Sequence, residues 1–254
     1  MLIDTHAHLD FPDFAGELPA VLQRAAEAGV RCIISIGTGV ESSKRAVALA
    51  ERHEMVYAAV GVHPCNVSVE PDDAVGQLAP LLAHPKVVAV GECGLDYYHE
   101  TGGAARQKTF LQQQLELAAA HGLNVIIHQR ASWDDTLAAL TPWHGRLRAV
   151  FHCFGENRAR ADELLRHNHL VSFTGIVTFK NAPVARDTVS GLPDGAFMVE
   201  TDCPYLAPVP HRGKRCEPAF VRRTAEAIAA LRGQSLDDLL AVTAAAARAF
   251  FRGL

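Results

Sequence analysis

The chain lacks several features that would assign it to a common class of protein. No stretch of the 254 residues is apolar over the length needed to cross a bilayer, and the N-terminus carries polar residues where a secretory signal would need an apolar segment. The six cysteines include no CxxC pair, which argues against a zinc ribbon or a disulfide framework. We therefore expect a cytoplasmic protein with reduced thiols and no membrane partner.

The chain also lacks an excess of basic residues. Its formal net charge is −4, whereas duplex nucleic acid is usually bound through many Lys and Arg contacts to phosphate. A broad face for duplex binding is therefore not expected, although a local basic pocket is compatible with this charge. A hydrophobic share of 49% with 20% charged residues is typical of a globular protein with a sizeable core.

Short apolar runs alternate with helix-like segments along the whole chain. Strands are expected at residues 3–8, 31–36, 55–62, 86–90, 124–127, 147–151, 169–173 and 196–200. Helices are expected at residues 14–28, 41–53, 71–83, 106–121, 133–140, 159–167, 182–190, 218–231 and 236–251. The runs are rich in Val and Ile without polar alternation, so the predicted parallel sheet is buried on both faces. No GxGxxG follows the first run, which disfavours a doubly wound open sheet. The sequence predicts an α/β protein, a single-domain TIM (β/α)8 barrel over residues 1–254.

Metal-capable side chains gather at the ends of these runs. His6 and His8 are two residues apart and would project from the same face of the first strand. Further candidates each follow a later apolar run: His63, Glu92, His128, His152 and Asp202. In barrels of this kind the active site forms at the C-terminal ends of the strands, where these residues would meet.

These residue types indicate a centre for hard or borderline divalent ions. A single histidine at a strand end is more often structural, but this many metal-capable groups favour a metal centre. Imidazole and carboxylate without cysteine select ions such as Zn, Mn, Fe, Co or Mg, and Glu92 could bridge two of them. We expect two divalent ions.

Residues with weaker patterns are candidates for supporting roles or for contacts to a substrate. Glu200 could point the same way as Asp202 or hold the tautomer of a histidine, and we assign it no catalytic role. Arg130, Arg212 and Lys214 could pair with phosphate oxygens, although solvated surface charge explains them almost as well. Tyr97 or Tyr98 could stack on a base, with core packing as the alternative for at least one of them.

Seven motifs connect the chain to a known family. They are IDTHAHLD (3–10), GVHP (61–64), GECGLDYY (91–98), IIHQR (126–130), FHCFGE (151–156), VETDCPYLAP (199–208) and RGKRCEP (212–218). With them the chain resembles the TatD-type metal-dependent hydrolases of the amidohydrolase superfamily over nearly its whole length. The resemblance implies that one ion is held by His6, His8, Glu92 and Asp202, and the other by Glu92, His128 and His152. It also implies that His63 and Asp96 line the same pocket, and we expect Asp96 to contact the substrate there.

The activity that the resemblance implies is hydrolysis of phosphodiester bonds, most simply as a 3′–5′ exodeoxyribonuclease acting on single-stranded DNA. A hydroxide bridging two ions (Mg, Mn or Zn) would attack the phosphorus, with Glu92, Asp202 and His63 as the catalytic residues. An amide or ester hydrolase, for example an aminoacyl-tRNA deacylase, is the alternative reaction, and a metal-binding protein without turnover is the alternative class. No obligate protein partner is expected.

Three positions depart from the family pattern. Cys65 follows the His-Pro pair where His is frequent, and Cys216 replaces the usual Asn of the RGKRNEP motif. Ala246 stands where Asn is usual near the C-terminus. We expect Cys216 to alter a contact near the substrate and Ala246 to concern packing.

Overall fold

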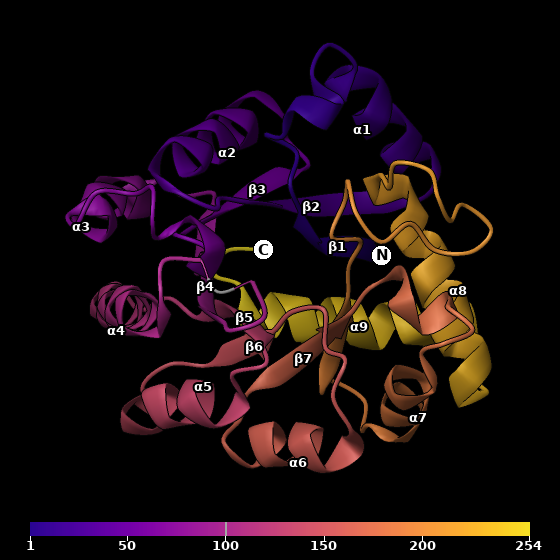
Figure 1. Cartoon of the computed structure of the whole chain (residues 1–254). Coiled ribbons are helices and arrows are strands. Elements are labelled where there is room, and N and C mark those ends of the chain that lie inside the picture. The colour runs from indigo at the N-terminus through magenta and orange to yellow at the C-terminus, as the bar shows by residue number, and fades with distance from the viewer. Residues whose placement is uncertain (100) are drawn as a thin grey trace. The chain divides into compact units, whose positions relative to one another are not determined.

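The computed structural model describes residues 1–99 and 101–254 (Figure 1). Its strands are β1 (Leu2–Ala7), β2 (Val30–Ile36), β3 (Val56–Val60), β4 (Val87–Asp96), β5 (Val125–Arg130), β6 (Ala149–Phe151), β7 (Leu170–Phe173) and β8 (Phe197–Val199). Its α-helices are α1 (Leu18–Glu27), α2 (Val40–Arg52), α3 (Ala74–Leu78), α4 (Ala104–Ala120), α5 (Trp133–Leu140), α6 (Arg158–Arg166), α7 (Pro183–Gly191), α8 (Val221–Arg232) and α9 (Leu236–Phe250). The strands are neighbours in the sheet in the order β1 to β8, as the alternating pattern predicts. Within these described residues, no helix is both long and apolar enough to span a membrane.

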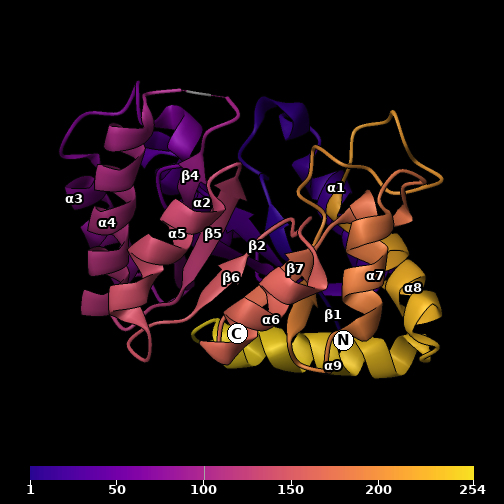
Figure 2. The same ribbon diagram turned by 60° about the horizontal axis from the view of Figure 1, so that its bottom comes forward.

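Two compact units can be distinguished in the chain, and the first contains residues 1–34 and 153–250. In this unit β7 and β8 pair in parallel, with Val171 opposite Phe197 and Phe173 opposite Val199. Helix α9 packs against β1 and β8, and α8 packs against α9 (Figure 2). The assignment of the whole chain to a single domain stays a prediction.

The second unit contains residues 35–152 and 251–254. Its central strand is β4, which pairs in parallel with β3 on one edge and with β5 on the other. Every residue of β4 is buried, as expected for a parallel strand that is covered on both faces. The polar residues of this strand therefore lie in the interior of the unit.

The expected end of the fourth strand, at Val90, was wrong. Strand β4 continues to Asp96, and its pairing with β5 places Gly94 opposite His128 and Asp96 opposite Arg130. Gly94 of GECGLD allows the two strands to approach closely. Gly94 has φ +146°, and a Cβ there would overlap the carbonyl oxygen of His128. The motif is therefore part of the sheet.

The third predicted helix is also shorter than expected. The sequence predicted one helix over residues 71–83, whereas α3 is followed by a 3-10 helix at Ala79–Ala83. Pro80 lies in this second segment and has no backbone N–H to donate, which prevents a continuous α-helix.

Two buried glutamines of α4 hold the ends of β3 and β4. The Gln114 side chain accepts from the N–H of Val62 at 2.7 Å and donates to the carbonyl of Val62 at 3.1 Å. Gln107 does the same at Asp96, accepting at 2.8 Å and donating at 2.9 Å. Residues seven apart lie on one face of a helix, so a single face of α4 satisfies both strand ends. The seven-residue spacing of the two glutamines was the available sequence signal for this role.

The close approach at Gly94 leads to a first prediction. We expect Gly94→Ala to destabilise the protein by about 1–3 kcal/mol, because Ala disfavours this backbone conformation and its Cβ would push β4 away from β5. Urea unfolding followed by circular dichroism measures the change.

Gly76→Ala is the matched control for this measurement. A Cβ at this helical glycine would meet no heavy atom within 4 Å, so the substitution should be neutral or stabilising by about 0.4–1 kcal/mol. Equal unfolding midpoints for the two variants would show that the β4–β5 contact imposes no requirement for glycine.

Candidate metal centre

The first unit brings three of the predicted ligands together. The Nε2 atoms of His6 and His8 lie 3.7 Å and 3.3 Å from Oδ1 of Asp202. The two imidazole rings are 5.1 Å apart and nearly perpendicular, and both histidines are buried. The backbone brings these groups together, because the N–H of Asp202 donates to the carbonyl of His6 at 2.9 Å and the N–H of His8 to that of Cys203 at 2.8 Å.

A buried carboxylate that was not among the predicted site residues supports this arrangement. Asp4 accepts from the backbone N–H of Thr201 at 2.8 Å and from its hydroxyl at 2.6 Å. Burial raises the pKa of Asp4 to about 8, although the hydrogen bonds from Thr201 oppose this rise. Asp4 thus connects β1 to the residue that precedes Asp202. The sequence signal available for this role of Asp4 was its position in the motif IDTHAHLD.

Glu200 has a supporting role in the first unit. Its carboxylate is buried and accepts from the N–H of Cys153 at 2.7 Å and from the hydroxyl of Ser172 at 2.6 Å. These bonds connect Glu200, which follows β8, to Ser172 of β7 and to Cys153. Glu200 therefore orients backbone at strand ends.

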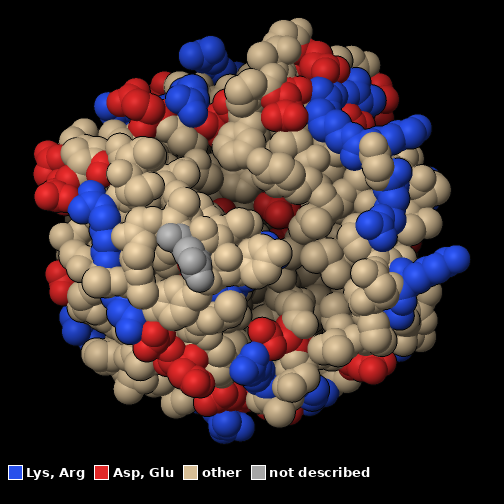
Figure 3. All heavy atoms as spheres, in the orientation of Figure 1, with Lys and Arg blue, Asp and Glu red and all other residues tan. Residues whose placement is uncertain are grey.

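The two basic residues that were predicted to contact phosphate in the segment between β8 and α8 are exposed. Figure 3 shows Lys and Arg atoms along the right-hand side of this face, where Figure 1 draws that segment in orange. Arg212 and Lys214 are both exposed, and the Arg212 guanidinium stacks over the ring of Phe179 at 3.9 Å. These side chains are accessible to an anionic ligand.

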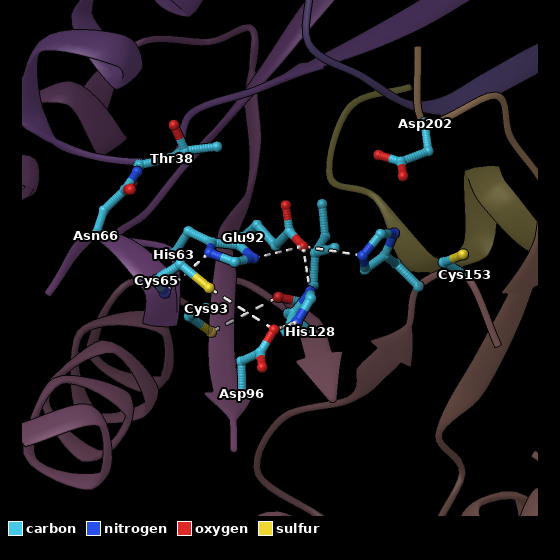
Figure 4. Close-up of polar contacts among 12 residues, drawn as sticks. Thr38, His63, Cys65, Asn66, Glu92, Cys93, Asp96, His128, Cys153 and Asp202 are labelled. Atoms are coloured by element: carbon cyan, nitrogen blue, oxygen red, sulfur yellow. Dashed lines mark hydrogen bonds and ion pairs between the residues drawn. The ribbon is translucent and has the colours of Figure 1, made fainter. Parts of the chain in front are cut away.

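In the second unit one carboxylate oxygen is surrounded by imidazoles (Figure 4). Oε1 of Glu92 lies 2.9 Å from Nε2 of His152, 3.0 Å from Nδ1 of His128 and 3.5 Å from Nε2 of His63. Glu92 is only 2% exposed. A carboxylate oxygen offers two lone pairs, so three nitrogens around it exceed what hydrogen bonding to that oxygen accounts for.

His128 is held between two carboxylates. Its Nδ1 faces Glu92, and its Nε2 lies 2.9 Å from Oδ2 of Asp96. Burial acts to lower the pKa of His128, but the hydrogen bonds to Asp96 and Glu92 outweigh it and raise that pKa. Burial likewise acts to raise the pKa of Asp96, and the bonds from His128 and His99 hold it well below its usual range instead. Asp96 therefore remains a carboxylate that orients His128.

His63 is oriented by its own backbone neighbour. Its Nδ1 accepts from the N–H of Cys65 at 3.0 Å, so a neutral His63 carries its proton on Nε2, which faces Glu92. A ring nitrogen that carries a proton is a hydrogen-bond donor and not a metal ligand. With this tautomer His63 is a hydrogen-bond donor toward Glu92, and its expected place in the pocket stays a prediction.

The donor atoms of the second unit suit a divalent ion. Nε2 of His152 and Nδ1 of His128 lie 2.9 Å and 3.0 Å from the same oxygen of Glu92. A histidine that binds a metal usually donates its other N–H to a carboxylate, and Asp96 occupies that place behind His128. The imidazole and carboxylate groups in each unit are therefore able to bind metal.

The remaining predicted substrate contacts of this unit differ in exposure. Arg130 is exposed and its guanidinium lies over the ring of Tyr98 at 4.1 Å, while Tyr98 itself is 65% exposed. The Tyr97 hydroxyl donates to Asp135 at 2.7 Å, which directs this ring toward α5. Asp96 is fully buried and bonded to histidine. The structure thus presents Arg130 and Tyr98 to solvent, and Asp96 and Tyr97 much less.

The three departures from the family motifs have distinct places. Cys216 is completely buried in the first unit, so its thiol is not presented to a substrate. Ala246 is buried on α9, as expected for a packing position. Cys65 is partly exposed, with its Sγ 3.7 Å from Oδ2 of Asp96.

Comparison with known proteins identifies the family. The family model described as TatD related DNase matches residues 3–252. The chain is 36% identical over 253 residues to the uncharacterized metal-dependent hydrolase YabD of Bacillus subtilis, covering 99% of each chain. It is 36% identical over 239 residues to the 3′-5′ ssDNA/RNA exonuclease TatD of Enterobacter lignolyticus, covering 92% of each.

A solved structure confirms the predicted fold. The crystal structure of the TatD homologue YjjV from Escherichia coli matches 98% of this chain and 97% of its own, with a TM-score of 0.92 at 33% identity. The fold is therefore a TIM barrel. With a model match over residues 3–252 and these relatives, the chain belongs to the TatD family of metal-dependent hydrolases.

Proposed function

We propose that this protein is a metal-dependent nuclease that shortens single-stranded DNA from its 3′ end. The observation that carries the proposal is the oxygen of Glu92 with three imidazole nitrogens within 3.5 Å. The relative from Enterobacter lignolyticus, whose name states this activity, supports the choice of substrate.

The residues able to hold ions fall into two sets. His6, His8 and Asp202 form one, and Glu92, His128 and His152 form the other. The family resemblance assigns Glu92 to both ions. When bound, Mg, Mn or Zn ions supply a Lewis acid for the phosphoryl oxygens and lower the pKa of water so that it attacks near neutral pH.

The protein itself supplies proton transfer and orientation. Asp202 is partly exposed and faces the imidazoles of His6 and His8, so we assign it the acceptance of a proton from the attacking water. His63 presents the N–H of Nε2 and is suited to stabilise charge on a non-bridging phosphate oxygen. Asp96 keeps His128 in one orientation.

The exposed groups suit a single strand. Arg130 over Tyr98 combines a cation for phosphate with an aromatic ring on which a base can stack, and such stacking is independent of sequence. Arg212 and Lys214 add positive charge in the other unit. A net charge of −4 leaves few cations for a duplex, whose binding needs contacts to many phosphates.

The first test of this function concerns Glu92. We expect Glu92→Gln to lower kcat on a phosphodiester by at least about 100-fold, because the amide has the shape of the carboxylate but not its charge. The thermal midpoint should change little, since the volume of the buried side chain is preserved. Glu116→Gln, on the exposed face of α4, is the control and should keep full activity. Near-normal turnover in Glu92→Gln would overturn the proposal.

A second test of this function concerns metal content. Purified protein should hold about two divalent ions per chain, falling toward about one in His128→Ala and in the double variant His6→Ala, His8→Ala. His121→Ala removes an exposed histidine at the end of α4 and should leave the content unchanged. Elemental analysis after dialysis measures this. An unaltered content in both ligand variants would remove these histidines from the ligand sets.

A third test of this function distinguishes attack at an end from attack within a strand. A labelled linear single strand should be shortened one nucleotide at a time in the presence of Mg or Mn, while a closed circle of the same sequence stays intact. Gel electrophoresis of time points resolves the two patterns. Rapid cutting of the circle would identify an endonuclease instead.

The label position and a variant complete this experiment. A 5′ label should yield a ladder of shortened strands, and a 3′ label should yield mononucleotide from the start, because the 3′ end is removed first. Glu92→Gln purified in the same way should leave both strands intact, which assigns the cleavage to this protein. Mononucleotide released first from the 5′ end would reverse the proposed polarity.

A further inference from the structure

A cysteine, a carboxylate and a histidine lie together in the second unit outside the two ligand sets described above. Sγ of Cys65 is 3.7 Å from Oδ2 of Asp96, and Nδ1 of His99 is 2.8 Å from the same oxygen. The possible ligand atoms of the three residues all lie within 4.8 Å of one another. Thiolate, imidazole and carboxylate are together the ligand types of zinc in proteins.

Backbone hydrogen bonds orient Asp96 toward Cys65 and His99. Oδ1 of Asp96 accepts from the N–H of Tyr98 and the N–H of His99, each at 2.9 Å, which turns Oδ2 toward Cys65 and the His99 ring. Cys65 is fixed in turn, because its N–H donates to His63 at 3.0 Å. The Asp96 carboxylate is therefore oriented by the backbone, and the backbone of Cys65 is held by His63.

The spacing of the donor atoms is close to that of a tetrahedral ion. With Zn–S near 2.3 Å and Zn–N or Zn–O near 2.0–2.2 Å, ligand atoms in such a site stand about 3.3–3.7 Å apart. The distances of 2.8 Å and 3.7 Å to Oδ2 of Asp96 bracket this range. Small rotations of the His99 side chain, which is 49% exposed, would bring its Nδ1 to the spacing of a zinc ligand.

The structure assigns a separate zinc site to this chain, formed by Cys65 Sγ, Asp96 Oδ2 and His99 Nδ1. The exposed His99 gives a Zn²⁺ ion access from solvent and leaves a fourth position for water. On binding, Cys65 loses its thiol proton to solvent and coordinates as the thiolate. A thiolate favours zinc and cobalt over Mg and Mn, so this site differs in selectivity from the imidazole and carboxylate sets.

The site is also connected to the candidate metal centre. Oδ2 of Asp96 lies 2.9 Å from Nε2 of His128 as well, so one oxygen serves both groups. An ion on Cys65 and His99 would share the oxygen that orients His128. The zinc site itself does not depend on the proposed nuclease activity.

Cobalt(II) titration of the reduced, metal-free protein tests this assignment. Only a thiolate ligand produces the intense sulfur-to-cobalt charge-transfer band in the near ultraviolet, whereas imidazole and carboxylate ligands do not. Wild type should develop this band to a plateau at about one equivalent of thiolate-bound cobalt. Zn²⁺ added afterwards should abolish the band by displacing cobalt.

Four variants make the result specific. Cys65→Ser should lose the band, and His99→Ala should need at least about 10-fold more cobalt to reach half of it. Cys153→Ser removes the other partly exposed cysteine and should keep the band. Glu92→Gln should keep it too, so that a failure of the nuclease proposal and a failure of this one are distinguishable. A wild type without the band, or a band that persists in Cys65→Ser, would overturn the zinc site.

Discussion

Oε1 of Glu92 lies within 3.5 Å of nitrogens from three imidazoles while the side chain is almost completely buried. A buried carboxylate is costly unless positive charge or hydrogen-bond donors surround it, so the neighbouring histidines have to be held in place. Asp96 holds His128, and the N–H of Cys65 holds His63. Asp96 and Cys65 thus hold two of the three imidazoles that face the buried oxygen of Glu92.

Parallel strands that are buried on both faces restrict where such groups can lie. A polar group inside such a strand needs hydrogen-bond partners, as Glu92 has within β4. Four other buried polar side chains bond backbone groups next to strand ends: Gln107 and Gln114 in the second unit, Asp4 and Glu200 in the first. Each satisfies backbone groups that the ladder leaves open, which makes the strand ends rigid enough to present ligands.

Asp96 lies between the candidate metal centre and the pair formed by Cys65 and His99. One of its oxygens accepts from two backbone N–H groups, and the other faces His128, His99 and Cys65. The hydrogen bonds from His128 and His99 keep its pKa low, so its charge is available at any physiological pH. Asp96 is placed to position these groups, and its predicted contact with substrate stays a prediction.

The sequence alone determined the order of strands and helices, the two-residue spacing of His6 and His8, and the family, because apolar periodicity and motif spacing are local properties. It could not determine that GECGLD lies inside β4, since a glycine that permits close strand packing has the same sequence signature as one in a loop. Nor could it show that Asp96 is hydrogen-bonded to His128, that His99 lies close to Cys65, or that Asp4 accepts a hydrogen bond from Thr201. Those contacts join segments that are distant along the chain or that turn at a strand end, and only the register of the strands and the packing of α4 decide which side chains meet.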